Sequence, residues 1–320
     1  MNSISQDAGR SNSAALRRLG ILGSPQGPYV RELAAAAQRR HPRTDVKFLS
    51  FGELAVGLED GRVSVTALTA DGENEAVDLL TLDGLVVRSM PLGSLEQVIF
   101  RMDALQAVEH AGVPVLNPPR CLELAIDKWL TLERLNRAGI ATPPTLACQS
   151  RCQAMEAYEK LGGDVVVKPL FGGEGRGIVR LTDADMAWRV FGTLHQLGSV
   201  IYVQQFLTNF GYDIRVLIIG QRILSVKRFA PIGGWRTNIS QGCRAQVHAL
   251  TSQEEQLACS AARVAGGSLL GIDLLPTRDG SLVVLEVNAV PGWKGTAAAL
   301  GVDVADSVIE HLELLHAQRR

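Results

Sequence analysis

The first third of the chain alternates short apolar runs with segments in which apolar residues recur at helical spacing. The pattern predicts strands over 19–24, 46–51 and 82–89, with helices over 29–40 and 95–111. A polar stretch separates the second strand from the third. Strands that alternate with helices are typical of βαβ units, so we predict an α/β domain over residues 18–119.

A proline-rich segment ends this pattern and marks a predicted domain boundary just after Pro119. Beyond it we predict a helix over 127–138, a strand at 165–168, antiparallel strands over 213–219 and 222–229, and a helix that starts with the capping box Thr251-x-x-Glu254. We therefore expect an α/β protein whose second part consists of two α+β lobes. The predicted division is a disordered tail 1–17, an N-terminal domain 18–119, and lobes 120–207 and 208–320.

Near its C-terminal end the sequence predicts a β-hairpin that carries acidic side chains. A two-residue turn at Asp279–Gly280, a strong hairpin signal, places Asp273 directly opposite Glu286. Asn288 lies on the same face because strand side chains alternate. Like charges so placed repel and a hard cation would bind between them, so three oxygen ligands predict a Mg²⁺ or Mn²⁺ site. The alternative is an exposed hairpin end with solvated acids.

A glycine-rich loop follows the predicted strand at 165–168. Lys168 ends that strand, and residues 171–177 contain four glycines. Backbone N–H groups without side chains in the way approach an anion closely, and the lysine adds a point charge, so the loop is a candidate phosphate site. It lacks the spacing of a P-loop, and the alternative is a flexible hairpin tip.

More cations lie between this loop and the acidic hairpin. Asp213 and Arg215 share one face of a predicted strand, and Lys227–Arg228 and then Arg236 with Asn238 follow. Cations placed in advance, together with a metal, stabilise the charge that spreads over a transferred phosphoryl group. Each of these charged side chains alone is also compatible with an ordinary exposed surface charge. Together with the glycine-rich loop and the acidic hairpin, they favour phosphoryl transfer.

Composition narrows the class of protein. With 46% hydrophobic and 20% charged residues among 320, the chain is typical of a globular protein of two or three domains. A net charge of −1 gives no basic field for nucleic acid, and no apolar run is long enough to span a membrane. The near-zero net charge favours small-molecule partners. Five cysteines without metal spacing suggest reduced thiols, so we expect a cytoplasmic protein. His311 and His316 are predicted to be solvated on a C-terminal helix.

An ordered series of motifs resembles the ATP-grasp carboxylate–amine ligases, and among them the RimK-type α-L-glutamate ligases. The motifs are Asp127-Lys-x-x-Thr131, Gly139-Ile-Ala-Thr-Pro-Pro144, Val166-Val-Lys-Pro169 with the glycine-rich loop, Val203-Gln-Gln-Phe-Leu207, Asp213-Ile-Arg215, Trp235-Arg-Thr-Asn238, and Gly271-Ile-Asp273 through Glu286-Val-Asn288-x-x-Pro-Gly292. The resemblance is strong over 127–303 and only architectural before it. It implies an ATP-grasp fold with an N-terminal Rossmann-like pre-ATP-grasp domain.

The resemblance also implies a role for each matching position. Phosphate contacts, an adenine-binding hinge and a ribose contact for ATP would come from Lys128, Lys168, Gly173, Gly175, Gly177, Gln204, Gln205, Phe206, Leu207 and Asp213. Two Mg²⁺ ions would be held by Asp273, Glu286 and Asn288. The phosphate and acyl-phosphate end would contain the catalytic residues Arg215, Arg236 and Asn238. Two positions depart from the family: Gln205 stands where many relatives have glutamate, and Gly242-Cys243 replaces a common Gly-Gly near the acceptor site.

Such a family member would be an ATP- and Mg²⁺-dependent ligase that adds an amino acid, glutamate, to an acceptor carboxylate through an acyl phosphate. The acceptor stays open between a reduced pterin such as tetrahydromethanopterin, a deazaflavin, a ribosomal protein and an amino-group carrier protein. The near-neutral chain favours a small cofactor. The other hypotheses are a non-catalytic nucleotide-binding regulator, and a nicotinamide oxidoreductase built on Gly20, Gly23 and Gly27, whose spacing departs from G-x-G-x-x-G. A homo-oligomer is compatible with the sequence.

Overall fold

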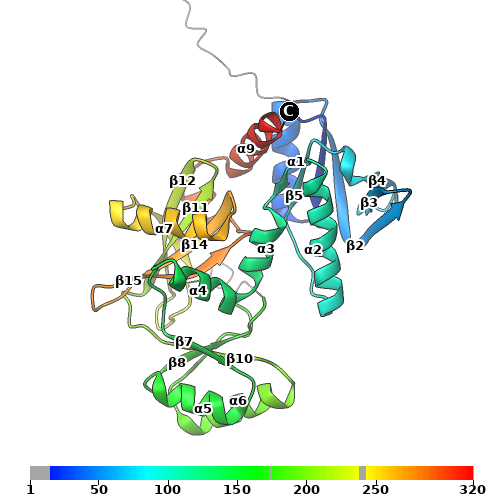
Figure 1. Cartoon of the computed structure of the whole chain (residues 1–320). Helices are drawn as coiled ribbons and strands as arrows, with labels where there is room; N and C mark the ends of the chain where they lie inside the picture. The colour runs from blue at the N-terminus through cyan, green and yellow to red at the C-terminus, as the bar shows by residue number, and fades with distance from the viewer. Residues whose placement is uncertain (1–14, 173–174, 238–242, 320) are drawn as a thin grey trace, which may run out of the picture. The chain divides into compact units, whose positions relative to one another are not determined.

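The structure is a computed structural model that describes residues 15–172, 175–237 and 243–319 (Figure 1). The chain divides into two compact units: Met1–Leu116 with Ala305–Arg320, and Asn117–Val304. The last helix, α9 (Val304–Gln318), therefore belongs mainly to the first unit, whereas the sequence grouped 208–320 together. Most of the predicted tail, residues 1–14, lies outside the described residues.

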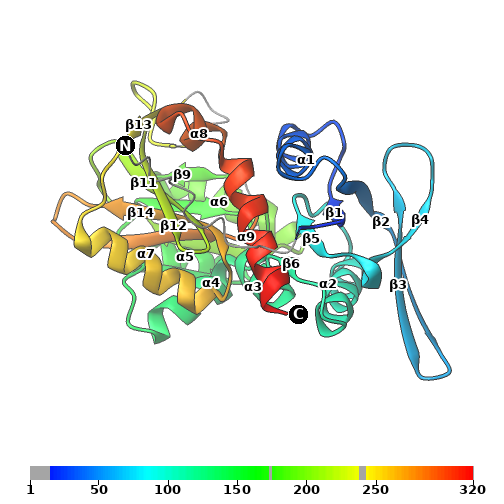
Figure 2. The same cartoon turned by 90° about the horizontal axis from the view of Figure 1, so that it is seen from above.

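The first unit contains a six-stranded sheet in the order β4-β3-β2-β1-β5-β6. Strand β1 pairs in parallel with β2, and β5 pairs in parallel with β6 in the opposite direction along the sheet. Right-handed crossovers therefore place α1, between β1 and β2, and α2, between β5 and β6, on opposite faces (Figure 2). The strands and helices are β1 (Arg18–Leu22), α1 (Pro28–Arg40), β2 (Asp45–Glu59), β3 (Arg62–Thr69), β4 (Ala76–Asp78), the short helix η1 (Leu79–Thr81), β5 (Gly84–Val87), α2 (Leu95–His110) and β6 (Val115–Leu116).

The polar stretch expected after the second strand is instead part of the sheet. Strand β2 continues to Glu59, and the chain returns antiparallel as β3 and β4. Asp60 and Gly61 both have positive φ, 50° and 73°, which is the geometry of a tight hairpin turn. The Asp-Gly pair was therefore a hairpin signal that the prediction missed.

The C-terminal helix packs within the first unit through its polar side as well as its apolar side. Glu313 is fully buried and accepts hydrogen bonds from the guanidinium of Arg40 at 2.8–3.2 Å. His316 lies 3.5 Å from Asp83 and is 8% exposed, so the prediction that it is solvated was wrong. Burial also lowers the pKa of His311. The apolar spacing on α9 is thus that of a packed helix, with His316 buried and His311 partly buried.

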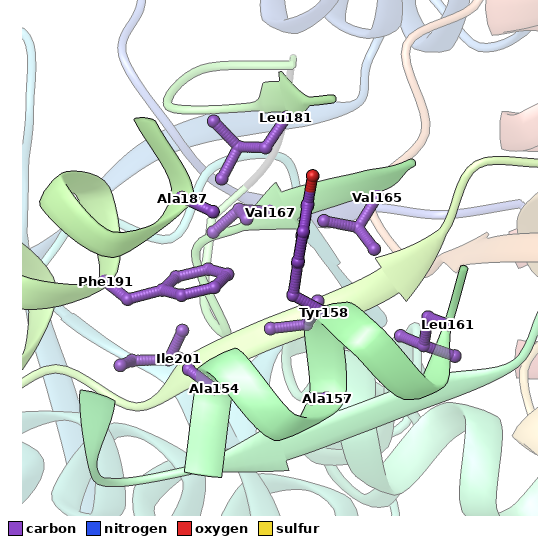
Figure 3. Close-up of a cluster of buried hydrophobic side chains, with 11 residues drawn as sticks. Ala154, Ala157, Tyr158, Leu161, Val165, Val167, Leu181, Ala187, Phe191 and Ile201 are labelled. Atoms are coloured by element: carbon purple, nitrogen blue, oxygen red, sulfur yellow. The ribbon is translucent and has the colours of Figure 1, made fainter. Parts of the chain in front are cut away.

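The second unit contains two antiparallel sheets. The smaller has the order β7-β10-β8-β9, and α5 and α6 cover one of its faces (Figure 1). Side chains that alternate along β8 and β10, such as Val165, Val167, Ile201 and Val203, pack with Phe191 of α6 in a buried core (Figure 3). The bounds are β7 (Thr145–Cys148), α5 (Arg151–Lys160), β8 (Val165–Lys168), β9 (Val179–Leu181), α6 (Ala184–Gln196) and β10 (Ile201–Gln205).

The larger sheet has the order β13-β12-β11-β14-β15, and α7 packs against β14 and β15. Thr251 and Glu254 form the predicted capping box of α7, and Gly266 ends this helix with φ 69°. The bounds are α3 (Pro119–Ile126), α4 (Lys128–Arg137), β11 (Tyr212–Ile219), β12 (Arg222–Phe229), β13 (Arg244–Val247), α7 (Ser252–Ala265), β14 (Leu269–Pro276), β15 (Leu282–Asn288) and α8 (Lys294–Leu300).

The hairpin β14–β15 has the predicted pair but not the predicted turn. Asp273 does face Glu286. The turn, however, is one residue longer, because Thr277 pairs with Ser281 and Gly280 has φ 87°. A bulge after Asp273 leaves Leu285 as the extra residue of β15, since Leu274 faces Val284. The bulge restores the register that the longer turn had shifted.

Within the described residues, no helix has both the length and the apolar character needed to cross a membrane.

Candidate functional site

A cavity in the second unit is lined by most of the predicted ATP-binding residues. Of the predicted positions, its lining includes Lys128, Lys168, Gly175, Gln204, Gln205, Phe206, Leu207, Asp213, Arg236, Asp273 and Glu286. Gly177, Arg215 and Asn288 are not in the lining. Gly173 and Asn238 lie outside the described residues.

Two lysines reach this cavity from different elements. Lys128 is the first residue of α4, and its Nζ donates to the backbone oxygen of Gly172 at 2.5 Å. Lys168 ends β8, and its Nζ donates to Oε1 of Gln204 at 2.7 Å. Burial lowers the pKa of both lysines, that of Lys168 to about 8, while the carboxylate of Glu286 opposes the shift. Both hydrogen-bond acceptors are neutral oxygens, so the two charges favour an additional anion.

The glycine-rich loop needs its glycines for conformation as well as for access. Gly175 and Gly177 have φ values of 73° and 70°, where a side chain is strained. A Cβ on Gly177 would also lie 2.9 Å from the ring of Pro169. The position of Gly177 outside the cavity lining indicates that this glycine shapes the loop.

Beside the lysines lies a buried network of two arginines and two aspartates. Arg228 donates to Asp213 from Nε at 2.7 Å and from Nη2 at 2.5 Å, and the same Nη2 lies 3.0 Å from Asp273. Arg215 binds Asp273 from the other side, at 2.5 and 3.1 Å. Thr237 donates a further hydrogen bond to Asp213 at 2.5 Å. Each aspartate is therefore held in place by arginine.

Burial and ion pairing act on these carboxyl groups in opposite directions. Burial raises the pKa of Asp213, although Arg228 opposes it. For Asp273 burial acts the same way, but Arg215 and Arg228 together outweigh it and the pKa is lowered. Asp273 thus remains a carboxylate at neutral pH, as a metal ligand must.

Arg228 is a site residue that the sequence prediction did not select. It lies directly opposite Asp213 in the β11–β12 ladder. The two strands are joined by Gly220 and Gln221, and counting back from that two-residue turn gives this pair. The signal was present, but Arg228 was counted with Lys227 as a general cation.

The predicted metal ligands provide a suitable set of oxygen donors. Asp273 and Glu286 are opposite each other, and Asn288 lies two residues further along the same face of β15. Nδ2 of Asn288 is buried without a hydrogen-bond partner among the described residues, and a flip of the amide would present its oxygen instead. Carboxylate and amide oxygens fit Mg²⁺ or Mn²⁺. Because arginines bind Asp273, a metal would replace one of those contacts.

The predicted hinge, 204–207, is fixed by contacts on both sides. The N–H of Phe206 donates to the backbone oxygen of Asp164 at 3.0 Å. The guanidinium of Arg180, itself paired with Asp164, lies 3.5 Å from the centre of the Phe206 ring. Trp235 meets that ring edge-on at 5.9 Å. The Arg180 contact links β9 to the residue that follows β10, and no local sequence pattern reveals it.

Arg236 extends from the segment next to Trp235. Its Nη2 donates to the backbone oxygen of Ile178 at 2.5 Å, and its guanidinium lies 4.7 Å from the Trp235 ring centre. Nε of Arg236 is buried without a hydrogen-bond partner among the described residues. One N–H of this cation is therefore available to an anionic ligand in the cavity.

Comparison with known proteins identifies the family of this chain. The sequence profile of the RimK-like ATP-grasp domain matches residues 125–312, more than half of the chain. The chain belongs to the RimK-like ATP-grasp family. The predicted family, the ATP-grasp fold and the prediction of a ligase are thereby confirmed.

Two relatives illustrate the range of similarity. The tetrahydromethanopterin:α-L-glutamate ligase of Methanosarcina acetivorans is 29% identical, over 93% of this chain and 99% of the relative. A probable α-L-glutamate ligase of Legionella pneumophila is 32% identical, over 70% of this chain and 78% of the relative.

Solved structures share the fold. The ATP-grasp ligase PsnB, complexed with its minimal precursor, is 21% identical with a TM-score of 0.70, covering 94% of this chain and 99% of PsnB. PsnB has also been solved with minimal precursor, Mg and ADP, with a TM-score of 0.69 at 20% identity over 93% and 97% of the two chains. At these identities the likeness describes the fold alone.

Proposed function

We propose that this chain is an ATP- and Mg²⁺-dependent carboxylate–amine ligase that adds L-glutamate to the carboxylate of a small acceptor through an acyl phosphate. The observation that carries the proposal is the gathering of Lys128, Lys168, Arg236, Asp273 and Glu286 around one cavity in a RimK-like ATP-grasp chain. The names of the relatives support glutamate as the amino acid.

In this proposal the lysines and the glycine-rich loop bind the triphosphate, and the hinge 204–207 binds the adenine. The neutral partners of Lys128 and Lys168 leave their charge available to phosphate oxygens. Mg²⁺ held by Asp273, Glu286 and Asn288 would neutralise charge on the transferred phosphoryl group. Arg215 acts through Asp273, which it orients from outside the cavity lining.

The proposed reaction has two steps, formation of an acyl phosphate and its aminolysis. An oxygen of the acceptor carboxylate attacks the γ-phosphorus of ATP, the bond to the β-phosphate oxygen breaks, and ADP leaves. The amine of glutamate then attacks the acyl carbon, the C–O bond of the acyl phosphate breaks, and inorganic phosphate leaves while the amine loses a proton. Arg236, with its available Nε, stabilises negative charge on the acyl phosphate. Positioning and charge suffice, so no protein nucleophile is required.

For the acceptor we favour a pterin-type cofactor with a carboxylated side chain. Support comes from the Methanosarcina acetivorans relative, whose alignment spans nearly the full length of both chains. The second candidate is a peptide, because one structure of the ligase PsnB contains a precursor peptide.

Mass spectrometry of the products tests the proposal. The protein is incubated with ATP, Mg²⁺ and amino-acid mixtures, with a tetrahydropterin carrying a carboxylate in one arm and acidic peptides in another. We expect glutamate on the pterin and ADP in equal amount, and Lys168→Ala and Glu286→Ala to abolish both.

The outcomes separate the hypotheses. Glutamate on peptides alone would replace the proposed acceptor. Tight ATP binding without ADP formation in any arm would favour a non-catalytic regulator and contradict the ligase chemistry.

A further inference from the structure

Four polar or amphipathic side chains share one face of the smaller sheet of the second unit. Tyr202 and Gln204 alternate with the core residue Val203 along β10, so they point away from α5 and α6. Across the ladder, Tyr202 faces Lys168 and Gln204 faces Thr145. The face opposite the buried core therefore brings a lysine, an amide and two hydroxyl groups together.

These groups form a hydrogen-bonded chain. Lys168 Nζ donates to Oε1 of Gln204 at 2.7 Å. Nε2 of Gln204 donates to Oγ1 of Thr145 at 3.0 Å and to the hydroxyl of Tyr202 at 3.2 Å. Thr145 in turn donates to the backbone oxygen of Pro143 at 2.8 Å. Gln204 is 2% exposed, so these contacts are its hydrogen-bonding environment.

The donors and acceptors of these hydrogen bonds can be arranged in only one direction. An ammonium group has three donors and no acceptor, so the atom of Gln204 that faces Lys168 must be the oxygen. At the other end the only hydrogen of the Thr145 hydroxyl is used on Pro143, so Oγ1 accepts from the amide. Burial raises the pKa of Tyr202, which therefore stays a neutral phenol that can accept as well. A flipped Gln204 would turn its NH₂ group toward the ammonium.

We propose that Gln204 and Thr145 are positioning residues for Lys168. The series of hydrogen bonds that starts at the Pro143 carbonyl holds the ammonium group of Lys168 at the place where the ATP phosphates bind. The inference rests on the proposed function, in which Lys168 contacts phosphate. A lysine is a point charge on a flexible four-carbon stem, so an anchor at its end selects the conformers that face the cavity. Tyr202 is the second acceptor that keeps the amide in this orientation.

Binding of a non-hydrolysable ATP analogue, measured by calorimetry, tests the inference together with steady-state kinetics. Thr145→Val keeps the shape and removes the hydroxyl. We expect it to weaken analogue binding about 5-fold, the worth of one typical hydrogen bond, with a matching rise in KM for ATP and a change in kcat below about 2-fold. Thr145→Ser should restore binding, because it keeps the hydroxyl. Thr193→Val, which removes the exposed hydroxyl that donates to the Arg189 backbone in α6, is the matched control and should bind like the wild type.

A double-mutant cycle shows whether Thr145 acts through Lys168. In a Lys168→Met background, Thr145→Val should cause no further loss of binding. The same 5-fold loss in both backgrounds, or no loss in Thr145→Val alone, would overturn the inference. If Lys168→Met itself binds the analogue like the wild type, the phosphate role in the proposed function fails instead.

Tyr202→Phe provides a second variant in case Thr145→Val does not fold. It removes one acceptor of Gln204 Nε2, and we expect a smaller loss, about 2- to 3-fold, that also disappears in the Lys168→Met background. An unchanged affinity in folded Tyr202→Phe would show that the amide needs no such support and would overturn the inference.

Discussion

The substitution Arg228→Met tests the buried ion network most severely. Arg228 is 5% exposed and is the principal partner of Asp213, which is 1% exposed. Without the guanidinium, Asp213 keeps the hydroxyl of Thr237, and Asp273 keeps Arg215. Removing one partner of a buried ion pair costs about 3–5 kcal/mol, since the remaining charge is desolvated and unpaired. We expect the free energy of unfolding to fall by an amount in this range.

The pH dependence of that loss identifies its cause. Burial already raises the pKa of Asp213 against the pull of Arg228, and loss of the arginine raises it further. A carboxyl group whose pKa is raised on folding costs stability above that pKa and none below the pKa of the unfolded chain. The difference between Arg228→Met and the wild type should therefore shrink as the pH is lowered through the pKa of Asp213 in the variant.

Urea unfolding, followed by tryptophan fluorescence from pH 7 downward, measures both quantities. The double variant Arg228→Met/Asp213→Asn removes the orphaned charge and should regain part of the lost stability at pH 7. A loss below about 1 kcal/mol at pH 7, or a loss that does not change with pH, would refute the assignment of this network as a buried, mutually dependent ion pair.

Three further predictions follow from single contacts. A Cβ on Gly271 would lie 2.6 Å from Nη1 of Arg215, so Gly271→Ala should displace that side chain from Asp273 and lower kcat by about 10-fold or more; equal kcat in both proteins would contradict this reasoning. Because burial lowers the pKa of Lys168 to about 8, kcat/KM for ATP should fall as the pH rises through about 8; a profile flat to pH 10 would contradict a lowered pKa for this lysine. Thr251→Ala removes the cap of α7 and should lower the free energy of unfolding by about 1 kcal/mol in urea titrations, whereas the conservative Thr251→Ser should not.

How far the sequence predicts this protein depends on how local each signal is. The capping box of α7 and the strands of β11 and β12 follow from short patterns, and the structure has them. The pair Asp273–Glu286 was predicted from the wrong turn, and it forms because a bulge at Leu285 offsets the extra turn residue. Strand alternation alone does not reveal the bulge. The prediction missed one residue in the turn and one in the bulge, and the two omissions cancel at the Asp273–Glu286 pair.

The remaining differences come from tertiary packing or from a signal that was not used. The stack of Arg180 on Phe206 joins elements whose proximity only the folded chain defines. The burial of His316 likewise depends on packing of the C-terminal helix within the first unit. The β2–β3 hairpin, in contrast, was readable from Asp60–Gly61. The family resemblance thus predicts much of the cavity lining, and hairpin counting predicts the Asp273–Glu286 pair, but neither predicts the contacts that hold these side chains in place.

The central claim is that ATP activates a carboxylate in the cavity that Lys168 and Glu286 help to line. Transfer of oxygen-18 tests it most directly: the acceptor carboxylate is labelled, the reaction runs with ATP, Mg²⁺ and glutamate, and the released phosphate is analysed by mass spectrometry. An acyl phosphate requires that one labelled oxygen per turnover appears in inorganic phosphate. Phosphate without label, or label in AMP, would contradict the claim.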